Sequence, residues 1–408
     1  MTGDLAGGAA RGTYWLHKAL VNLGVDSRIL VGGSSHFSDQ RIVAVTRNIG
    51  QRFFNSLSHR LGELPRQFYR TNHQHQQFDT GFGGSRYWQN ETFRRADIIN
   101  LHHITGTVSV PSLHSIRKPL VWTMRSMWPF TGGCHYSFDC KKYQMSCSAC
   151  PQLNSTSKYD LANATLRTKR RFYPPHLQLV GVSDWVTQCA RSSTLLKSFP
   201  IQTIYNGIEL DEFQPVERGD AIRSLGLKPE PHYLLAIAQN FENRYKGFEE
   251  LKQALRSVKS SNCHLLLVGH IDQTRLAELN FPHTSLGTVK DPAVLRALYS
   301  AATAHLASNL METFGKTLVE AMACGTPVVC FSSTGPKEIV EHRVTGFCAP
   351  PYDAAAFAAG IDWILALKPD AYQTIATNAR QKAVQRFDSL VIARQYVALY
   401  ESMLQRHV

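Results

Sequence analysis

The stretch that decides the fold runs Glu312-Thr-Phe-Gly315-Lys-Thr-Leu-Val-Glu320-Ala-Met-Ala-Cys-Gly325-Thr-Pro-Val-Val329. Its pattern predicts a helix over 315–323, followed at once by a buried strand over 327–331. Glu312 then lies in the loop before the helix, and Glu320 lies inside it. A helix N-terminus attracts a diphosphate, and carboxylates nearby suit sugar and ribose hydroxyls. The same residues also fit an ordinary surface helix with two glutamates of no special role.

Short apolar runs alternate with helical patterns throughout the C-terminal half. This alternation predicts a parallel sheet with helices on both faces, and such sheets bind ligands at the carboxyl ends of their strands. The expected strands are 233–238, 263–269, 303–307 and 327–331, and the expected helices are 248–259, 292–301, 315–323, 354–367 and 372–386.

The N-terminal half has the same rhythm in a less regular form, with strands expected at 27–31, 98–102, 120–124 and 178–182. A polar, basic and aromatic stretch between Arg47 and Arg95 fits no strand and predicts an insertion with two helical pieces. With 408 residues the chain is long enough for two domains. The sequence predicts an α/β protein with two doubly wound Rossmann-like domains facing across a cleft. They are expected at 1–198 and 199–389, with an amphipathic helix over 390–408 that packs back on the first.

The segment from Glu312 to Val329 resembles the E-x7-E signature of the retaining family-4 glycosyltransferases, which have the GT-B fold. Further matches follow in the right order, so the resemblance covers essentially the whole chain. They are Gly7-Gly8, Ile98-Ile-Asn-Leu-His102, Asn206-Gly-Ile, Lys246-Gly247 and Gly335-Pro…Glu338…Gly346-Phe. The stretch Trp128-Pro-Phe-Thr-Gly-Gly-Cys-His-Tyr136 resembles a subset of the family that has a four-cysteine loop.

The resemblance implies a metal-independent hexosyltransferase. It would move a sugar from a nucleoside-diphosphate sugar to a saccharide or lipid-linked acceptor, in polysaccharide or glycolipid biosynthesis. Lys246 would neutralise the leaving diphosphate in place of a divalent metal, Glu312 would hold the donor sugar and Glu320 the donor ribose. The implied catalytic set is Glu312, Lys246 and His102. The implied donor-binding set adds Gly7, Gly8, Arg125, Asn206, Arg244, Phe314, Gly315 and Lys316.

Each of these residues also has a structural interpretation. Taken alone, Lys246 fits a solvated lysine beside a turn glycine, and His102 fits a polar residue at a strand end. Gly7 and Gly8 fit a flexible tail as well as a loop that sits against a donor phosphate.

Two departures from the family pattern affect the predicted site. Family members carry an arginine about five residues before Lys-Gly, where this chain has Phe241, and Arg244 is the nearby cation that could replace it. Where the subset has His-Asp after a strand, this chain has Arg125-Ser126. An arginine stays protonated and cannot transfer a proton as histidine does, but it can clamp a phosphate or a carboxylate. This departure bears on the identity of the substrate.

Positive charge is concentrated in the first half of the chain. Residues 1–200 carry 24 Lys and Arg against 10 Asp and Glu, whereas residues 201–408 carry 20 against 21. A basic half suits nucleic acid, anionic lipid or a phosphorylated substrate. Basic and aromatic residues interleave in the insertion, a mixture that nucleic acid and membrane surfaces both use. Because many glycosyltransferase acceptors are lipid-linked, we expect peripheral contact with an anionic membrane and no nucleic acid.

Four of the nine cysteines fall within seventeen residues: Cys134, Cys140, Cys147 and Cys150. Four thiolates at these spacings suit a closed tetrahedral zinc site, and Gly132-Gly133 and Pro151 permit the tight turns that it needs. An iron–sulfur cluster also takes four thiolates. Four partly buried free cysteines are the third interpretation. A zinc ion here would be structural, because four thiolates leave no open coordination position.

The lack of long apolar runs and the N-terminal residues bear on where in the cell the protein acts. No apolar run reaches the ~20 residues of a transmembrane helix, and MTGDLAGGAAR has no secretory pattern. We therefore expect a cytoplasmic protein at the inner face of the membrane. Only Met1–Asp4 precede Leu5-Ala-Gly7-Gly8, too few for an ordinary strand, which predicts a natural start roughly ten residues upstream.

Two alternatives to a glycosyltransferase use the same scaffold. The first is a non-catalytic, zinc-stapled protein that binds a nucleotide sugar or nucleic acid, and Arg125 in place of histidine is its main support. The second is a nucleotide-sugar epimerase, which would need a further set of catalytic carboxylates in the first half.

Overall fold

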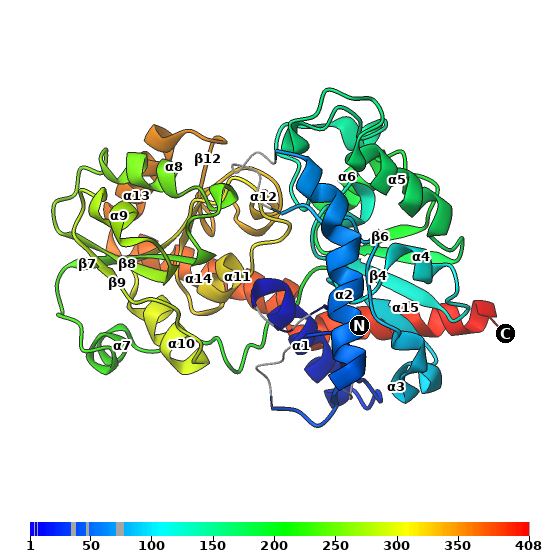
Figure 1. Cartoon of the computed structure of the whole chain (residues 1–408). Coiled ribbons are helices and arrows are strands. Elements are labelled where there is room, and N and C mark those ends of the chain that lie inside the picture. Colours follow the sequence, from blue (N-terminus) through cyan, green and yellow to red (C-terminus); the bar gives the residue numbers. More distant parts are fainter. Residues whose placement is uncertain (4, 6, 34–37, 46–48, 71–76, 408) are drawn as a thin grey trace. The chain divides into compact units, whose positions relative to one another are not determined.

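The computed structural model describes residues 1–3, 5, 7–33, 38–45, 49–70 and 77–407. The chain divides into two compact units (Figure 1): the first is Met1–Tyr205 with Ile392–Val408, and the second is Asn206–Val391. The sequence predicted a boundary between residues 198 and 199. The structure has it seven residues later, because strand β6 (Ile201–Thr203) pairs with the sheet of the first unit. Both units have parallel sheets with helices packed on them, so the predicted α/β class is confirmed.

The first unit contains a four-stranded parallel sheet in the order β3-β4-β5-β6, formed by β3 (Ile99–Leu101), β4 (Leu120–Met124), β5 (Leu177–Gly181) and β6. Strands β1 (Ile29–Val31) and β2 (Ile42–Ala44) form a separate parallel pair. Residues 1–3 hydrogen-bond to both sheets. The Thr2 N–H donates to the Leu30 carbonyl (3.1 Å), and the His102 N–H donates to the Met1 carbonyl (2.9 Å). The strands end at one edge, where His102 and Arg125 follow β3 and β4.

Helices pack on this sheet and return the chain between its strands. The Asp160 carboxylate caps α5 by accepting from the Asn163 N–H, and the Ser183 hydroxyl caps α6 by accepting from the Val186 N–H. The last helix, α15, belongs to the first unit from Ile392 onward. The helices are α1 (Gly7–Asn22), α3 (Glu91–Arg95), α4 (Val110–Leu113), α5 (Leu161–Phe172), α6 (Asp184–Ser192) and α15 (Ser389–His407).

The predicted insertion forms helix α2 (Ile49–Glu63), which continues into the 3-10 turn η1 (Leu64–Phe68), and ends with α3. Arg47, Asn48 and residues 71–76 of this segment lie outside the described residues. Helix α2 attaches to the unit by polar and glycine contacts. The Glu63 carboxylate accepts from the Thr80 N–H (2.9 Å) and hydroxyl (2.7 Å), and Gly62 lies so near Gly83 that a Cβ would clash. The attached face of α2 is therefore polar.

The second unit contains a six-stranded parallel sheet in the order β12-β11-β10-β7-β8-β9. The chain starts at β7 and places β8 and then β9 on one side of it. It then returns to the other side of β7 and continues through β10, β11 and β12. The strand order therefore reverses between β7 and β10, which is where doubly wound sheets bind ligands. The strands are β7 (His232–Asn240), β8 (Cys263–His270), β9 (His283–Ser285), β10 (Ala304–Ala307), β11 (Val328–Phe331) and β12 (Gly346–Ala349).

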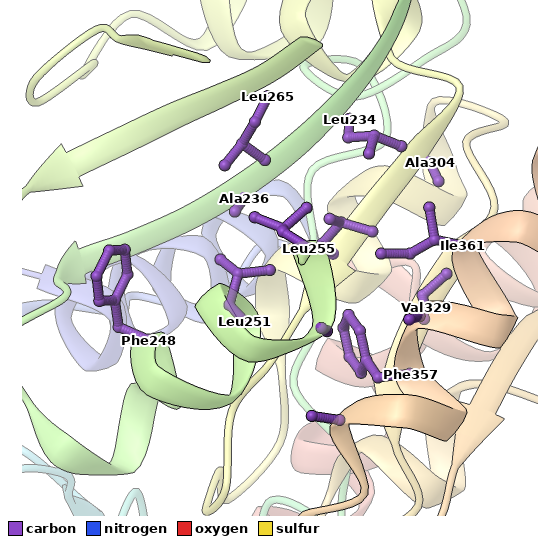
Figure 2. Packing of buried hydrophobic residues seen from close by; sticks show 14 of the residues in the cluster. Leu234, Ala236, Phe248, Leu251, Leu255, Leu265, Ala304, Val329, Phe357 and Ile361 are labelled. Carbon is purple, nitrogen blue, oxygen red and sulfur yellow. The ribbon is translucent and has the colours of Figure 1, made fainter. Parts of the chain in front are cut away.

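One face of this sheet packs against α8 and α13. Alternate residues along the strands, such as Leu234 and Ala236 in β7 and Leu265 in β8, meet Leu251 and Phe357 from the two helices (Figure 2). Each buried Leu or Phe contributes about 1.5–3 kcal/mol to folding. On the other face, α10 and α11 contact β7 and β10. The helices are α7 (Arg218–Ser224), α8 (Phe248–Leu255), α9 (Gln273–Ala277), α10 (Pro292–Ala301), α11 (Lys316–Ala323), α12 (Pro336–Ile339), α13 (Ala354–Leu365) and α14 (Pro369–Phe387).

Within the described part of the chain, none of the helices combines the length and the apolar character that crossing a bilayer requires.

Candidate functional site

Two loops meet at the reversal point of the second sheet. One follows β7 and contains the 3-10 turn η6 (Arg244–Lys246), and the other follows β10 and leads to α11. Backbone contacts tie the loops together. The Leu310 N–H donates to the Tyr245 carbonyl (2.9 Å), and the Ser308 hydroxyl donates to the Lys246 carbonyl (3.0 Å). The side chains of these loops are therefore fixed against one another.

The loops bring together Lys246 and Glu312, which the sequence separates by 66 residues. The Lys246 amine donates to a Glu312 carboxylate oxygen at 2.9 Å, and the Asn309 amide donates to the same oxygen at 3.1 Å. Both charged side chains are less than one-fifth exposed. Burial alone would lower the pKa of Lys246, but attraction to Glu312 outweighs it and raises that pKa. The amine therefore remains a cation at neutral pH.

Glycines at two positions allow this arrangement. Gly247 has a φ of 67°, and a Cβ there would lie 1.9 Å from the Ser308 carbonyl oxygen, so the two loops could not approach with any other residue. Gly315 has a φ of 109° and begins α11. The first turn of a helix presents N–H groups whose acceptors must come from outside the helix. The N-terminus of α11 thus follows Glu312 by a few residues.

Glu320 lies on the second turn of α11 and is almost fully buried. Its Oε2 accepts from the hydroxyl of Tyr299 on α10 at 2.8 Å, and its Oε1 is 3.8 Å from the Lys316 amine. A carboxylate has about four acceptor positions, so the Tyr299 contact still leaves capacity for a ligand hydroxyl. Lys316 and Phe314 flank Gly315, and Phe314 packs its ring against Phe387.

Arg244 and Phe241 occupy different environments, although both lie between β7 and Lys246. The Arg244 guanidinium forms a bidentate pair with Glu250 of α8, at 2.8 and 2.5 Å. Phe241 is buried and packs edge-on against Phe248. A cation at position 241 would therefore enter the apolar core, whereas Arg244 is already held by a carboxylate.

In the first unit, His102 and Arg125 lie together at the ends of β3 and β4. A guanidinium nitrogen of Arg125 is 3.3 Å from His102 Nδ1. Burial, followed by the Arg125 charge, lowers the pKa of His102 well below its usual value, so its ring is neutral. Arginine can only donate, so Nδ1 accepts and the ring proton is on Nε2. Burial lowers the pKa of Arg125 to about 10, which leaves it charged.

Helix α15 adds a polar network to this edge of the sheet. The Asn100 amide donates to the Tyr400 hydroxyl (2.8 Å), and the Thr123 hydroxyl bonds the Tyr396 hydroxyl (3.1 Å). Both tyrosines also interact electrostatically with Arg125. No sequence motif indicates this network, because its partners are about 270 to 300 residues apart.

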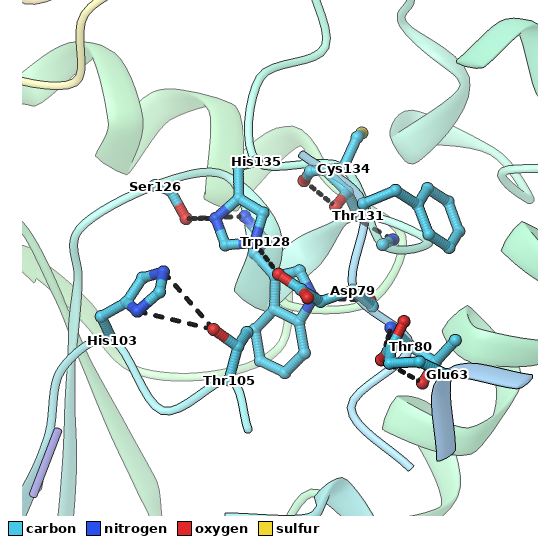
Figure 3. Close-up of polar contacts among 12 residues, drawn as sticks. Glu63, Asp79, Thr80, His103, Thr105, Ser126, Trp128, Thr131, Cys134 and His135 are labelled. Carbon is cyan, nitrogen blue, oxygen red and sulfur yellow. Dashed lines mark hydrogen bonds and ion pairs between the residues drawn. The ribbon is translucent and has the colours of Figure 1, made fainter. Parts of the chain in front are cut away.

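Sequence reasoning also missed a chain of hydrogen bonds that links the four-cysteine loop to Asp79 (Figure 3). His135 Nε2 is 2.8 Å from an Asp79 carboxylate oxygen, and His135 Nδ1 is 3.1 Å from the Ser126 hydroxyl. Burial raises the pKa of Asp79, but the bond from His135 and the electrostatic effect of the neighbouring histidines together outweigh it, and the net pKa is lowered. The ring of His103 lies 5.3 Å from that of His135, and burial lowers the pKa of His103 to about 4. This cluster fixes the loop against residues 77–79.

The remaining predicted site residues have simple placements. Gly7 and Gly8 are the first two residues of α1, so the expectation that they lie in a loop is wrong, because the helix begins one residue after Ala6. Asn206 is the first residue of the second unit and is buried. The residues predicted to contact the donor are divided between the units. Glu312, Phe314, Gly315, Lys316, Glu320, Lys246, Arg244 and Asn206 are in the second, and His102, Arg125, Gly7 and Gly8 are in the first.

Two family models match the chain. Residues 6–212 match "Glycosyltransferase Family 4", and residues 218–382 match "Glycosyl transferases group 1". The chain belongs to this family of glycosyltransferases. It is similar to the phosphatidyl-myo-inositol mannosyltransferase of Mycobacterium tuberculosis, with 29% identity over 249 residues, or 56% of this chain and 61% of that protein. The chain spans 55% and 61% of the length of the first curated relatives it matches.

Solved structures with the same architecture are GT-B glycosyltransferases, which confirms the predicted fold. Sucrose-phosphate synthase from Thermosynechococcus elongatus has a TM-score of 0.70 at 22% identity, covering 99% of this chain and 96% of that chain. Anabaena HepE in complex with UDP and glucose has a TM-score of 0.65 at 21% identity, covering 97% and 96%.

Proposed function

We propose that this protein is a retaining, metal-independent glycosyltransferase that moves a hexose from a nucleoside-diphosphate sugar to a saccharide or lipid-linked acceptor. The observation that carries the proposal is the Lys246–Glu312 pair, held between two loops at the reversal point of the second sheet. Cleavage of the bond between the sugar and the diphosphate leaves negative charge on the phosphate oxygen. A fixed cation beside a helix N-terminus stabilises that charge, as a divalent metal does in other enzymes.

The two members of the pair then have separate roles. A bound diphosphate competes with Glu312 for the Lys246 amine, and this frees the carboxylate to accept from hydroxyls of the donor sugar. Glu320 accepts from the ribose with the capacity that Tyr299 leaves. The acceptor oxygen forms the new bond to the anomeric carbon on the face that the leaving group vacates. Its proton passes to the departing phosphate oxygen, so no enzyme nucleophile is required.

His102 and Arg125 have a supporting role in this proposal. Because Nδ1 of His102 accepts from Arg125, its Nε2–H is a donor and not a base at neutral pH. We propose that it positions a hydroxyl or phosphate oxygen by donation. Arg125 keeps the histidine in this tautomer and supplies a positive charge at the same edge.

A panel of UDP-, GDP- and ADP-linked hexoses, scored by the thermal unfolding midpoint, tests the proposal. A ligand of the folded state stabilises it by RT ln(1 + [L]/Kd), about 2.7 kcal/mol at a hundredfold excess over Kd. We expect one donor to raise the midpoint by several degrees and to be consumed when a suitable acceptor is added. If no nucleotide sugar shifts the midpoint but single-stranded nucleic acid does, the non-catalytic binding alternative replaces the enzyme.

We also propose that the first unit contacts an anionic membrane through α2 and η1. Positions 53, 57 and 61 recur at intervals of four on α2 and so share one side of that helix, and positions 64 and 68 follow in η1. They are large, apolar and exposed: Phe53 (71%), Leu57 (43%), Leu61 (55%), Leu64 (42%) and Phe68 (88%). Arg60, Arg66 and Arg70 are exposed in the same segment. Apolar residues flanked by arginines, on a helix whose attached face is polar, suit insertion at a lipid surface.

The double variant Leu61→Ser with Phe68→Ser should lower the affinity for phosphatidylglycerol-containing vesicles by more than about tenfold, because two large apolar side chains no longer enter the interface. Vesicle cosedimentation measures it. Leu286→Ser, at an exposed leucine of the second unit, is the matched control and should bind like the unsubstituted protein. Wild-type binding should also weaken as NaCl rises from ~0.1 to ~0.5 M. Undiminished binding by the double variant would exclude this surface.

A further inference from the structure

The loop between β4 and α5 has little regular structure and contains all four clustered cysteines. Its regular elements are the 3-10 turns η3 (Trp128–Phe130), η4 (Lys142–Gln144) and η5 (Pro151–Leu153). Cys134, Cys140, Cys147 and Cys150 nevertheless line one small pocket of about 20 Å³, together with Gly132, Tyr143 and Ala162. Cys134 interacts electrostatically with each of the other three sulfurs. Four cysteines spread over seventeen residues therefore line one region of the fold.

The backbone around this pocket adopts an unusual conformation. Four residues other than glycine have positive φ between 47° and 50°: Phe138, Cys147, Ala149 and Asn154. Such residues cost of order 1 kcal/mol or more each and persist only where the surroundings hold them. The turns that they form wrap the chain around the sulfurs. The loop is held in part by contacts with the rest of the unit, such as the bond from His135 to Asp79, and an attraction at the pocket would add to them.

Donors and a buried cation surround the sulfurs. The Gly132 N–H donates to Cys147 Sγ at 3.2 Å, and the N–H groups of Gln152 and Leu153 donate to Cys150 Sγ. The fully buried Lys169 donates to the carbonyls of Trp128 (2.5 Å) and Thr131 (3.0 Å), and it interacts with Cys134 and Cys147. Burial raises the pKa of Cys134, Cys147 and Cys150 and lowers that of Lys169 to about 7, while the amide donors oppose the shift of Cys147 and Cys150. The geometry of the pocket thus places hydrogen-bond donors beside two of the four sulfurs.

We propose that Cys134, Cys140, Cys147 and Cys150 bind one zinc ion with four thiolate ligands, and that this ion fixes the loop between β4 and α5. Among the described residues, no three His, Cys, Asp or Glu side chains stand at metal-binding geometry, so the thiols turn inward when the ion enters. Each thiol loses its proton to solvent, and the resulting centre carries two negative charges. The pocket has room for a single ion, and four thiolates leave that ion no open coordination position.

The ion would affect the candidate site only by fixing the position of this loop. Ser126 and His135 belong to this loop. Within it, the Thr131 hydroxyl donates to the Cys134 carbonyl at 2.6 Å. The donor-binding residues Lys246, Glu312 and Glu320 belong to the other unit. The zinc proposal and the glycosyltransferase proposal therefore stand or fall separately.

Metal analysis of the full chain, purified without added zinc, should give about one zinc per chain. Removal of the zinc with a chelator should make four further thiols reactive toward a disulfide reagent. Cobalt added to the stripped protein should give the intense visible bands of tetrahedral sulfur coordination. This measurement needs no substitution, so it decides the question even where a cysteine variant does not fold.

Cys147→Ser should lower the zinc content at least about tenfold and lower the unfolding midpoint, with the affinity for a nucleotide-sugar donor unchanged. Cys348→Ser, at a cysteine of the second unit, is the matched control and should keep the zinc. Protein that contains no zinc, and whose four thiols react equally before and after chelation, would overturn the proposal. Iron in the purified protein would also overturn it, and so would cobalt-treated protein that lacks the intense visible bands of tetrahedral sulfur coordination.

Discussion

Lys246→Ala is expected to slow sugar transfer by roughly 10²–10³-fold, which is the usual effect of removing one fixed group that stabilises charge in a transition state. The amine pairs with Glu312 before the donor binds, so it is already placed when the phosphate oxygen gains charge. We expect kcat to fall more than donor affinity, because the charge on the phosphate grows as the bond breaks. Steady-state kinetics with the donor that the thermal panel identifies measures both.

Lys252→Ala is the matched control for this variant. Lys252 pairs with Glu249 and Glu278 at the surface of the same unit, and exposed pairs of this kind contribute about 0–1 kcal/mol. It should transfer sugar at the normal rate. Lys246→Arg should restore part of the activity, because arginine keeps the positive charge but carries it on a planar group of different shape. If Lys246→Ala is as active as Lys252→Ala, the role assigned to the Lys246–Glu312 pair is wrong.

Glu320→Ala should weaken donor binding by roughly 10–100-fold, since a hydrogen bond to a charged acceptor contributes about 1.5–3 kcal/mol. The carboxylate is buried on α11 and accepts from Tyr299, so its position does not depend on the ligand. Isothermal titration with the nucleotide sugar measures the affinity. The nucleoside diphosphate alone should show the same loss, because the ribose is common to both.

Tyr299→Phe separates the ligand contact from the internal one. This variant removes the hydroxyl that bonds Glu320 but keeps the carboxylate. It should lower stability by about 1 kcal/mol and leave donor affinity within roughly threefold. If Tyr299→Phe weakens the donor as much as Glu320→Ala does, or if Glu320→Ala binds donor normally, Glu320 serves the fold and not the ribose.

Apolar strands and their helices were the predictable part of the fold. The expected helix over 292–301 coincides with α10, and the expected strand over 263–269 is one residue shorter than β8. β8 is buried along most of its length and α10 buries one apolar face, so local hydrophobicity suffices to find them. Residues 1–3 show the limit of this reasoning. They join β1 to β3 through backbone hydrogen bonds, and backbone bonds leave no signature in residue type.

The candidate site was predictable where one motif carries it and unpredictable where distant segments meet. Lys246 and Glu312 were each identified from the family resemblance, but their 2.9 Å contact depends on the pairing of β7 with β10. Arg244 was proposed as a cation that could replace the arginine of the family, and nothing in the local sequence indicated that Glu250 holds it. Asp79 and His135 were missed because 56 residues separate them and each is an ordinary residue in its own surroundings.

Helix α15 completes the first unit only after the second has been made. Its Tyr396 and Tyr400 bond Thr123 and Asn100, yet the ribosome must first synthesise the 186 residues of Asn206–Val391. At 5–20 residues per second this takes roughly 10–40 s. Throughout that interval the first unit lacks the tyrosines that bond Thr123 and Asn100. When it ends, the second unit has all of its residues and the first still lacks Ile392–Val408. The order of folding in the cell is therefore expected to be the reverse of the order of synthesis.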